Sequence, residues 1–204
     1  PLDSLMDNWF KAIRGAGIQA VDGRIRADNT LFDEHSIPDY WPWIDMGNYY
    51  AAGTNALCIN DNLFHLYFQP GPYTGAPAGV LRTEPEIEGL SFDNHMKTGR
   101  PGSGDNGYIY AAPGQYRLLL RGTIPADGKP FSIKGALPDP ALFCARHMRT
   151  YVIEKGIPVE GVPDKIVEKA DYRDMKLITE TQSPPLSDIV TIINKRSFNL
   201  YTEQ

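Results

Sequence analysis

The chain has 204 residues, of which 42% are hydrophobic and 22% are charged, a composition that argues against a disordered or membrane-embedded protein. Its 19 glycines and 17 prolines favour short strands joined by turns and exclude an all-helical bundle. The net charge of -5 provides no positive field for a polyphosphate, so nucleic acid is excluded as a partner.

Two similar helix-then-strand segments lie far apart in the sequence. Residues 4–14 carry apolar side chains at helical spacing after a Ser4 cap, and residues 18–27 alternate as a hairpin or bulged strand does. The second segment predicts a helix from an Asp139 cap to Lys155, followed by a strand over 156–162. The repeated order predicts one α/β layer that is interrupted by a long insertion.

The insertion, residues 53–128, has the pattern of a small β domain. Short β-type runs alternate with turns rich in glycine and proline. The predicted runs are 57–68, 79–82, 107–111 and 116–122.

The C-terminal part predicts one more strand and one more helix. Residues 175–182 are a strand candidate, and Ser183-Pro184-Pro185 begins a helix that ends at Asn194-Lys195-Arg196. Ser197-Phe198-Asn199 follows this helix directly.

Cysteine and histidine do not indicate a metal centre. Cys58 and Cys144 both lie in apolar stretches, so we expect two buried small side chains, and the sequence leaves open whether they pair. The histidines share no flanking pattern and have no metal-ligand spacing, which predicts no metal site and no cofactor. They are His35, His65, His95 and His147.

Ser197-Phe198-Asn199 is by itself a weak S-x-N motif, and a polar cap between two helices is the simpler interpretation. Several other tracts strengthen the catalytic interpretation of this motif. Together, and in their order along the chain, they resemble the class C penicillin-binding proteins, the D-alanyl-D-alanine carboxypeptidase/endopeptidase family (peptidase family S13). The tracts are Trp41-Pro42-Trp43, Gly47-Asn48-Tyr49-Tyr50, Arg82-Thr83-Glu84-Pro85, Gly102-Ser103-Gly104-Asp105-Asn106, Arg121-Gly122-Thr123-Ile124-Pro125 and Pro138-Asp139-Pro140-Ala141-Leu142-Phe143.

The resemblance implies a serine acyl-transfer enzyme with an S-x-x-K nucleophile motif, an S-x-N motif and a K-T-G motif. It gives Ser197 the role of a proton relay and Asn199 that of a hydrogen-bond partner for the substrate's peptide amide. No serine in the chain is followed by lysine three positions later. We therefore expect the nucleophile upstream of Pro1, and the 204 residues to be an inactive piece of a longer chain.

Lys97-Thr98-Gly99 spells K-T-G but precedes the S-x-N motif, which reverses the family order. We interpret it as a coincidental match in a loop of the β insertion, and expect the working K-T-G motif downstream of residue 204.

Asp45 and Tyr50 lie in a proline-bounded loop that is crowded with aromatic residues. The residues alone favour an aromatic cluster that closes a domain edge. The resemblance instead implies a substrate contact, in which the Asp45 carboxylate binds the free amine of a diamino acid in the peptidoglycan stem.

The sequence thus predicts an α+β, multidomain protein. The expected α/β accessory domain covers 1–52 and 129–165, the inserted β domain 53–128, and part of a β-lactamase/transpeptidase-like, penicillin-binding domain 166–204. The resemblance implies a periplasmic D-Ala-D-Ala carboxypeptidase that binds peptidoglycan stem peptides and beta-lactams, has no transmembrane segment in this stretch, and allows a homodimer. The alternative is a non-catalytic module that binds peptide, glycan or a partner.

Overall fold

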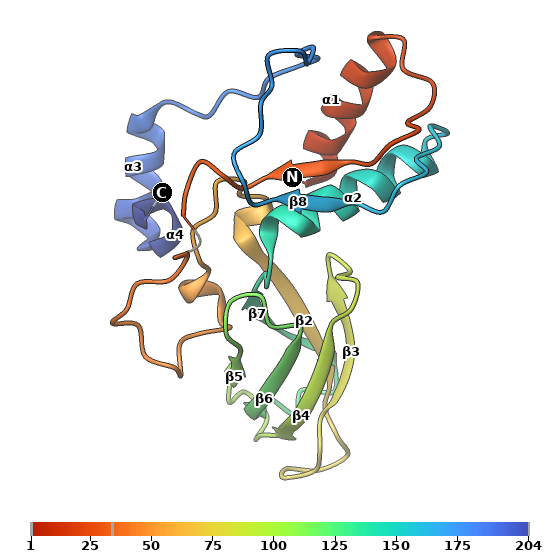
Figure 1. The fold of residues 1–204 in the computed structure, drawn as a ribbon. Helices are drawn as coiled ribbons and strands as arrows, with labels where there is room; N and C mark the ends of the chain where they lie inside the picture. The colour runs from red at the N-terminus through yellow and green to blue at the C-terminus, as the bar shows by residue number, and fades with distance from the viewer. Residues whose placement is uncertain (1, 34, 204) are drawn as a thin grey trace. The chain divides into compact units, whose positions relative to one another are not determined.

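A computed structural model describes residues 2–33 and 35–203 (Figure 1). The chain is a mixed α/β protein whose contacts divide it into two units. Among the described residues, no helix combines the length and apolar character needed to cross a membrane. Unit 1 consists of Pro1–Glu34, Asn55–Asn60 and Pro140–Tyr201, and unit 2 of His35–Thr54, Asp61–Asp139 and Thr202–Gln204.

In unit 1, a short parallel sheet pairs two segments that are distant in the sequence. Strand β1 (Arg26–Asp28) pairs with β8 (Asp164–Ile166), and Val21 forms a parallel bridge with Val159. The Arg26 guanidinium contacts the Asp164 carboxylate at 2.8 Å, directly across the pair. Of the two forms predicted for 18–27, the hairpin is therefore wrong, because the partner of this strand is distant in sequence rather than adjacent to it.

Two helices pack in unit 1. Helix α1 (Leu2–Gly15) begins before Ser4, which therefore lies inside the helix rather than at its cap. Helix α2 (Pro140–Glu154) agrees closely with the predicted helix. Its small residues Ala141 and Ala145 form a buried cluster with Ala27 of β1, so that the strand approaches the helix closely.

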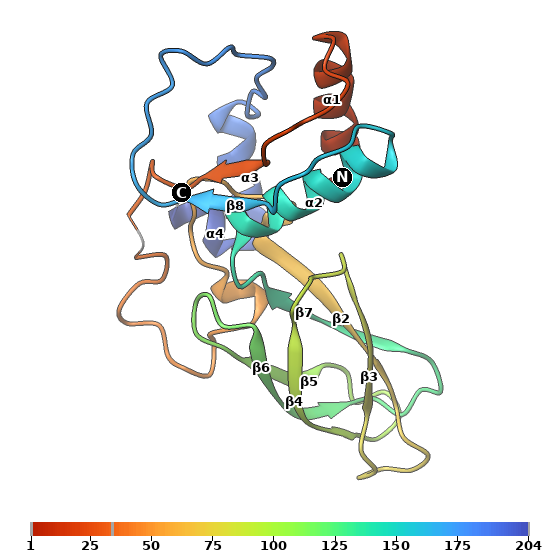
Figure 2. The same ribbon diagram turned by 45° about the vertical axis from the view of Figure 1, so that its right-hand side comes forward.

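Unit 2 contains two sheets of three strands each (Figure 2). In one, the strands are antiparallel and β2 is central; in the other, β6 is central and pairs in parallel with β4 and antiparallel with β5. The strands are β2 (Leu63–Gln69), β3 (Gly79–Glu84), β7 (Phe131–Ala136), β4 (Ser91–Thr98), β5 (Asn106–Tyr110) and β6 (Arg117–Ile124).

The inner faces of these two sheets form the core of unit 2. Alternate residues of β2, namely Phe64, Leu66 and Phe68, have no exposed surface. A Cβ atom on Gly135 of β7 would lie 2.5 Å from the Phe64 ring, and one on Gly107 of β5 would lie 2.2 Å from the Met96 side chain. The same two Cβ atoms would also lie 2.8 Å from the Ile109 side chain and 3.3 Å from the Ile133 side chain of the opposite sheet, so glycine at these positions lets the sheets approach each other closely.

The two units divide the chain differently from the expected domains. Strand β7 lies in a stretch that the sequence assigns to the α/β accessory domain, yet it pairs with β2 from Leu63–Ala136 to Phe68–Phe131. Unit 2 accordingly continues to Asp139, and it also includes residues 35–54.

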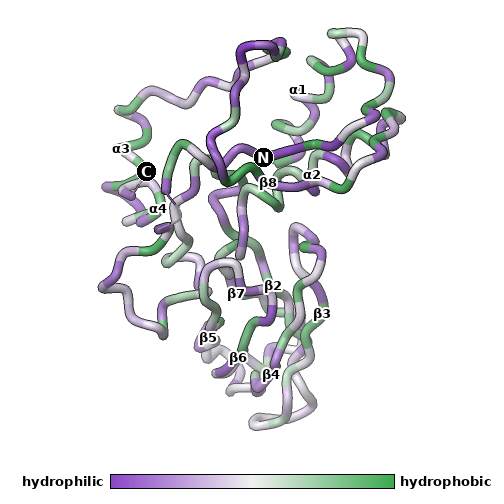
Figure 3. The backbone as a smooth tube through the Cα atoms, in the orientation of Figure 1, coloured by the Kyte–Doolittle hydropathy of each residue, from purple (hydrophilic) through white to green (hydrophobic). Residues whose placement is uncertain are grey.

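The C-terminal segment contains helix α3 (Leu186–Arg196) and helix α4 (Asn199–Glu203). No residue from 167 to 199 is buried, although Figure 3 shows hydrophobic residues alternating with hydrophilic ones along this stretch. The strand predicted at 175–182 is wrong, since this segment is irregular. A strand needs a partner for its backbone groups, and no described strand pairs with this segment.

Candidate functional site

The loop that precedes the short helix η1 (Tyr49–Ala51) brings Asp45 and Tyr50 together. Both side chains are half-buried, and the Asp45 carboxylate is near enough to the Tyr50 hydroxyl for its charge to act on that group. Burial, with the negative charge of Asp45 as the next cause, raises the pKa of Tyr50 to about 12. Tyr50 therefore remains protonated at neutral pH and keeps a hydroxyl that can donate to the carboxylate.

Asn48 anchors this loop to the edge strand β5. Its side chain is 4% exposed, and its amide donates to the carbonyl oxygens of Ile44, Asp45 and Ile109 at 3.0, 3.1 and 3.2 Å. Its Oδ1 accepts from the Ile109 N–H at 3.0 Å. Both the N–H groups and the oxygen of one buried amide thus fix the backbone beside Asp45.

Gly47 permits the close approach of this loop to β5. Its φ is 92°, and a Cβ atom there would lie 2.5 Å from the Ile109 carbonyl oxygen. Gly47 and Asn48 belong to one of the family-like tracts, but the sequence alone predicted no role for either residue. A Gly-Asn pair soon after an acidic residue was the available signal, but nothing local in the sequence identifies Ile109 as the partner.

Ser197 and Asn199 lie at the junction between α3 and α4. Ser197 is exposed and adopts the left-handed conformation at φ 49° and ψ 52°, with its N–H donating to the Ile193 carbonyl at 2.8 Å. Asn199 is the first residue of α4 and is half-buried. The junction presents a hydroxyl to solvent two residues before an amide, an arrangement that can relay a proton and bind a peptide group.

The predicted site residues therefore form two pairs. Asp45 and Tyr50 contact each other within unit 2, and Ser197 and Asn199 are neighbours within unit 1. Each pair is positioned by its own unit.

Lys97-Thr98-Gly99 is not in a loop, which corrects that expectation: Lys97 and Thr98 are the last residues of β4. Thr98 is 1% exposed, and its Oγ1 accepts from the Gly71 N–H at 2.7 Å. The Gly99 N–H donates to the Ile124 carbonyl at 2.7 Å. A substrate has no access to this hydroxyl, and the hydrogen bonds of Thr98 and Gly99 hold β4 to the neighbouring segments of unit 2.

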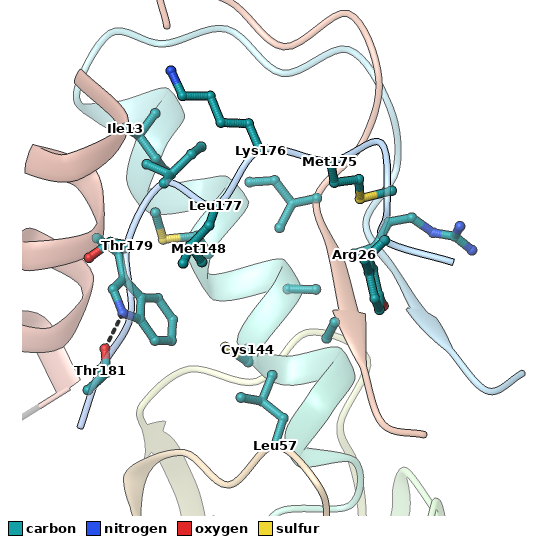
Figure 4. Close-up of a pocket in the computed structure, with 16 residues that line it drawn as sticks. Ile13, Arg26, Leu57, Cys144, Met148, Met175, Lys176, Leu177, Thr179 and Thr181 are labelled. Atoms are coloured by element: carbon teal, nitrogen blue, oxygen red, sulfur yellow. Dashed lines mark hydrogen bonds between the residues drawn. The ribbon is translucent and has the colours of Figure 1, made fainter. Parts of the chain in front are cut away.

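An apolar cavity of about 670 Å³ lies in unit 1 between α1, α2, β1 and residues 172–181 (Figure 4). The Trp9 indole N–H donates to Thr181 Oγ1 at 2.8 Å at one side of it. Cys144 lines this cavity, and burial raises the pKa of its thiol to about 12, so the thiolate needed for a nucleophile does not form at neutral pH. Cys144 is therefore not a candidate nucleophile.

The two cysteines differ in burial. Cys144 is buried as expected, whereas Cys58 is only half-buried, which corrects the expectation for that residue. The Cys58 thiol donates to the Asn55 carbonyl at 3.4 Å. Both side chains are thiols rather than halves of a disulfide.

Comparison with known proteins identifies the class. Residues 2–204 match the profile of the D-Ala-D-Ala carboxypeptidase 3 (S13) family. The chain therefore belongs to peptidase family S13, the class C penicillin-binding proteins. A D-alanyl-D-alanine carboxypeptidase from Actinomadura sp. (strain R39) is 26% identical over 206 residues, which is 97% of this chain and 38% of that protein.

Solved structures share the fold. Penicillin binding protein 4 from Haemophilus influenzae superimposes with a TM-score of 0.73 at 16% identity, over 96% of this chain and 43% of that protein. The same protein complexed with a novel beta-lactam gives a TM-score of 0.63 at 14% identity, over 98% of this chain and 40% of that one. The chain thus spans less than half the length of the relatives it matches.

Proposed function

We propose that this chain is part of a serine-type D-Ala-D-Ala carboxypeptidase/endopeptidase that acts on peptidoglycan stem peptides in the periplasm. The observation that carries the proposal is the family match through the S-x-N motif, whose serine is exposed at the α3–α4 junction. The 204 residues contain no S-x-x-K motif, so the nucleophile belongs to another part of the longer enzyme and these residues alone are inactive.

In this reaction the nucleophilic serine attacks the carbonyl carbon of the penultimate D-alanine and forms an acyl-enzyme. The C–N bond breaks, and the departing amine must gain a proton. The Ser197 hydroxyl passes a proton toward that nitrogen, and the Asn199 amide hydrogen-bonds the peptide group of the substrate. Water then hydrolyses the ester, which releases the shortened stem peptide.

The domain arrangement is part of the same proposal. Residues 166–204 contribute to the penicillin-binding domain, and the preceding residues form an accessory domain with a β insertion. The absence of any buried residue from 167 to 199 supports this, because a segment whose apolar side chains remain largely accessible fits one that packs against the rest of the enzyme.

Asp45 and Tyr50 give the proposal its specificity. An ionised carboxylate accepts several hydrogen bonds, so Asp45 can hold both the Tyr50 hydroxyl and the ammonium group of a diamino acid side chain. In the extended enzyme, Asp45→Ala should raise KM for stem peptides with a free diamino acid amine and leave simpler D-Ala-D-Ala substrates nearly unchanged. Equal effects on both substrates would contradict this assignment.

A fluorescent penicillin tests the proposed chemistry directly. The 204-residue chain should form no covalent adduct, whereas a version extended at both ends to the length of its relatives should be labelled at a serine outside these residues. Labelling of the 204-residue chain at one of its own serines would overturn the proposed location of the nucleophile.

A further inference from the structure

Three aromatic side chains of unit 2 are neighbours in succession, and we call them the aromatic row: Trp43, Tyr110 and Tyr108. The ring centroids of Trp43 and Tyr110 are 6.3 Å apart, and those of Tyr110 and Tyr108 are 6.4 Å apart. Trp43 is 52% exposed and Tyr108 38% exposed. Large aromatic side chains with this much accessible surface, gathered in one line, indicate a binding surface rather than a core.

The row lies on the outer face of the sheet formed by β4, β6 and β5. Along β5, Ile109 is fully buried, while Tyr108 and Tyr110 alternate with it and point to the other face. Arg121 of β6 lies opposite Tyr108 in the strand register, and His95 of β4 lies opposite Arg121. Rings are thus flanked by polar side chains that can bind hydroxyl or amide groups.

The edge of β5 is not available to an extended peptide. A peptide that adds a strand to a sheet needs the outward N–H and C=O groups of the edge strand. On β5 the two groups of Ile109 are bound by the Asn48 side chain, and the following Ala111 N–H donates to the Met46 carbonyl at 3.4 Å. A ligand of this region therefore meets the rings on the face of the sheet rather than its edge.

The row is continuous with the candidate substrate site. Trp43 lies two residues before Asp45 in the same loop, and Tyr108 is near enough to Tyr50 to contribute to the raised pKa of that residue. A ligand on the row thus lies beside the carboxylate to which the diamino acid of a stem peptide is assigned.

We propose that the aromatic row binds the glycan strand of peptidoglycan, a chain of β-1,4-linked N-acetylhexosamines, next to the stem peptide that the strand carries. The apolar faces of successive pyranose rings stack on successive aromatic rings, and the flanking polar groups bind hydroxyl and acetamido groups. This inference rests on the proposed function, because it assigns the second half of the same substrate.

The binding test uses the 204-residue chain and two separate probes: a β-1,4-linked N-acetylglucosamine tetrasaccharide and a free stem pentapeptide. Titrations are followed by the indole N–H signals of the three tryptophans, with that of Trp43 assigned through Trp43→Phe. The tetrasaccharide should shift the Trp43 signal. Trp43→Ala and Tyr108→Ala should each weaken its binding by about tenfold.

Two controls keep the test specific. Tyr108→Phe keeps the ring and should keep the affinity, and Tyr73→Ala removes a 68% exposed tyrosine outside the row and should have no effect. Equal affinity in all variants, absence of tetrasaccharide binding, or binding of the pentapeptide alone to the row would each overturn the proposal. Penicillin labelling involves no sugar, so the proposed catalytic function and the glycan surface can fail independently.

Discussion

The two-sheet core of unit 2 and the segment 167–199 of unit 1 both carry apolar side chains, but these side chains differ sharply in burial. In unit 2, Phe64, Leu66 and Phe68 are completely buried. In the segment, Leu177 and Leu186 are 74% and 73% exposed, and no residue is buried. The apolar side chains of the unit 2 core thus have their packing partners within the chain, whereas those of the segment remain largely exposed.

A core substitution should separate the two regions most strongly. Phe64→Ala should lower the free energy of unfolding of unit 2 by about 3–5 kcal/mol, because it leaves a cavity in a tightly packed core. Leu177→Ala, the matched control, should change it by less than about 0.5 kcal/mol. Urea unfolding followed by far-UV circular dichroism measures both. Similar losses in the two variants would mean that the segment is packed as tightly as the core.

The anchor of the substrate loop should show the next largest effect. Asn48→Ala removes the amide that binds Ile44, Asp45 and Ile109 and should cost about 1–3 kcal/mol of unfolding free energy. The pKa of Tyr50 should also fall from about 12 toward its ordinary value of 10.0 as the loop loosens. Tyrosine-labelled NMR titration, with Tyr50→Phe for assignment, checks this. An unchanged pKa would show that Asn48 does not position the pair.

A smaller effect should be seen in unit 1, where the contribution of His147 on α2 to the free energy of unfolding depends on pH. Burial holds the pKa of His147 below its ordinary 6.5, against the opposing charges of Asp3 and Glu154, and its ring stacks on Phe143. The folded state favours neutral His147, so this contribution to stability is complete above pH 6.5 and is lost as the pH falls through the lowered pKa.

Unfolding by urea at a series of pH values below 7 measures this contribution. His147→Gln should remove part of the loss of stability on acidification that the unsubstituted chain shows in this range. Parallel pH profiles for the two proteins would contradict the assignment to His147.

The smallest expected effect is a difference in reactivity between the two thiols. It concerns the cavity that Cys144 lines and that residues 172–181 border. With its pKa raised to about 12, Cys144 should react with iodoacetamide at pH 8 far more slowly than half-buried Cys58. Mass spectrometry of Cys58→Ala and Cys144→Ala measures each thiol separately. Equal rates would indicate that residues 172–181 leave the cavity open to reagents.

Local patterns predicted much of the fold. Helices α2 and α3 lie near their predicted bounds. A proline marks the start of each helix, a glycine follows the end of α2, and a polar run ends α3. Strand β4 was missed because polar residues such as Asp93, Asn94 and His95 hide its alternation. The parallel partner of β1 was also beyond local reasoning, since the pairing depends on residues at the other end of the sequence.

From the sequence, only the polar residues proposed to meet the substrate could be predicted, and not the residues that hold them in place. The spacing of Asp45 and Tyr50, with the family resemblance, indicated a pair that the structure brings into contact. The anchor Asn48 was not predicted, because its partners on β5 are set by the tertiary fold. The K-T-G tripeptide shows the converse, since in a motif identical in letters the Thr98 hydroxyl is buried and bonded within unit 2 here.

Substitution of Ser197 in the extended enzyme tests the central claim most directly. Ser197→Ala should slow acylation by a fluorescent penicillin by about a hundredfold or more, because a proton relay of this kind contributes roughly 10² or more to the rate. Ser187→Ala, which changes another exposed serine on α3, should acylate at the unsubstituted rate. Equal acylation rates for the Ser197→Ala and Ser187→Ala enzymes would contradict the assignment of the α3–α4 junction to the catalytic site.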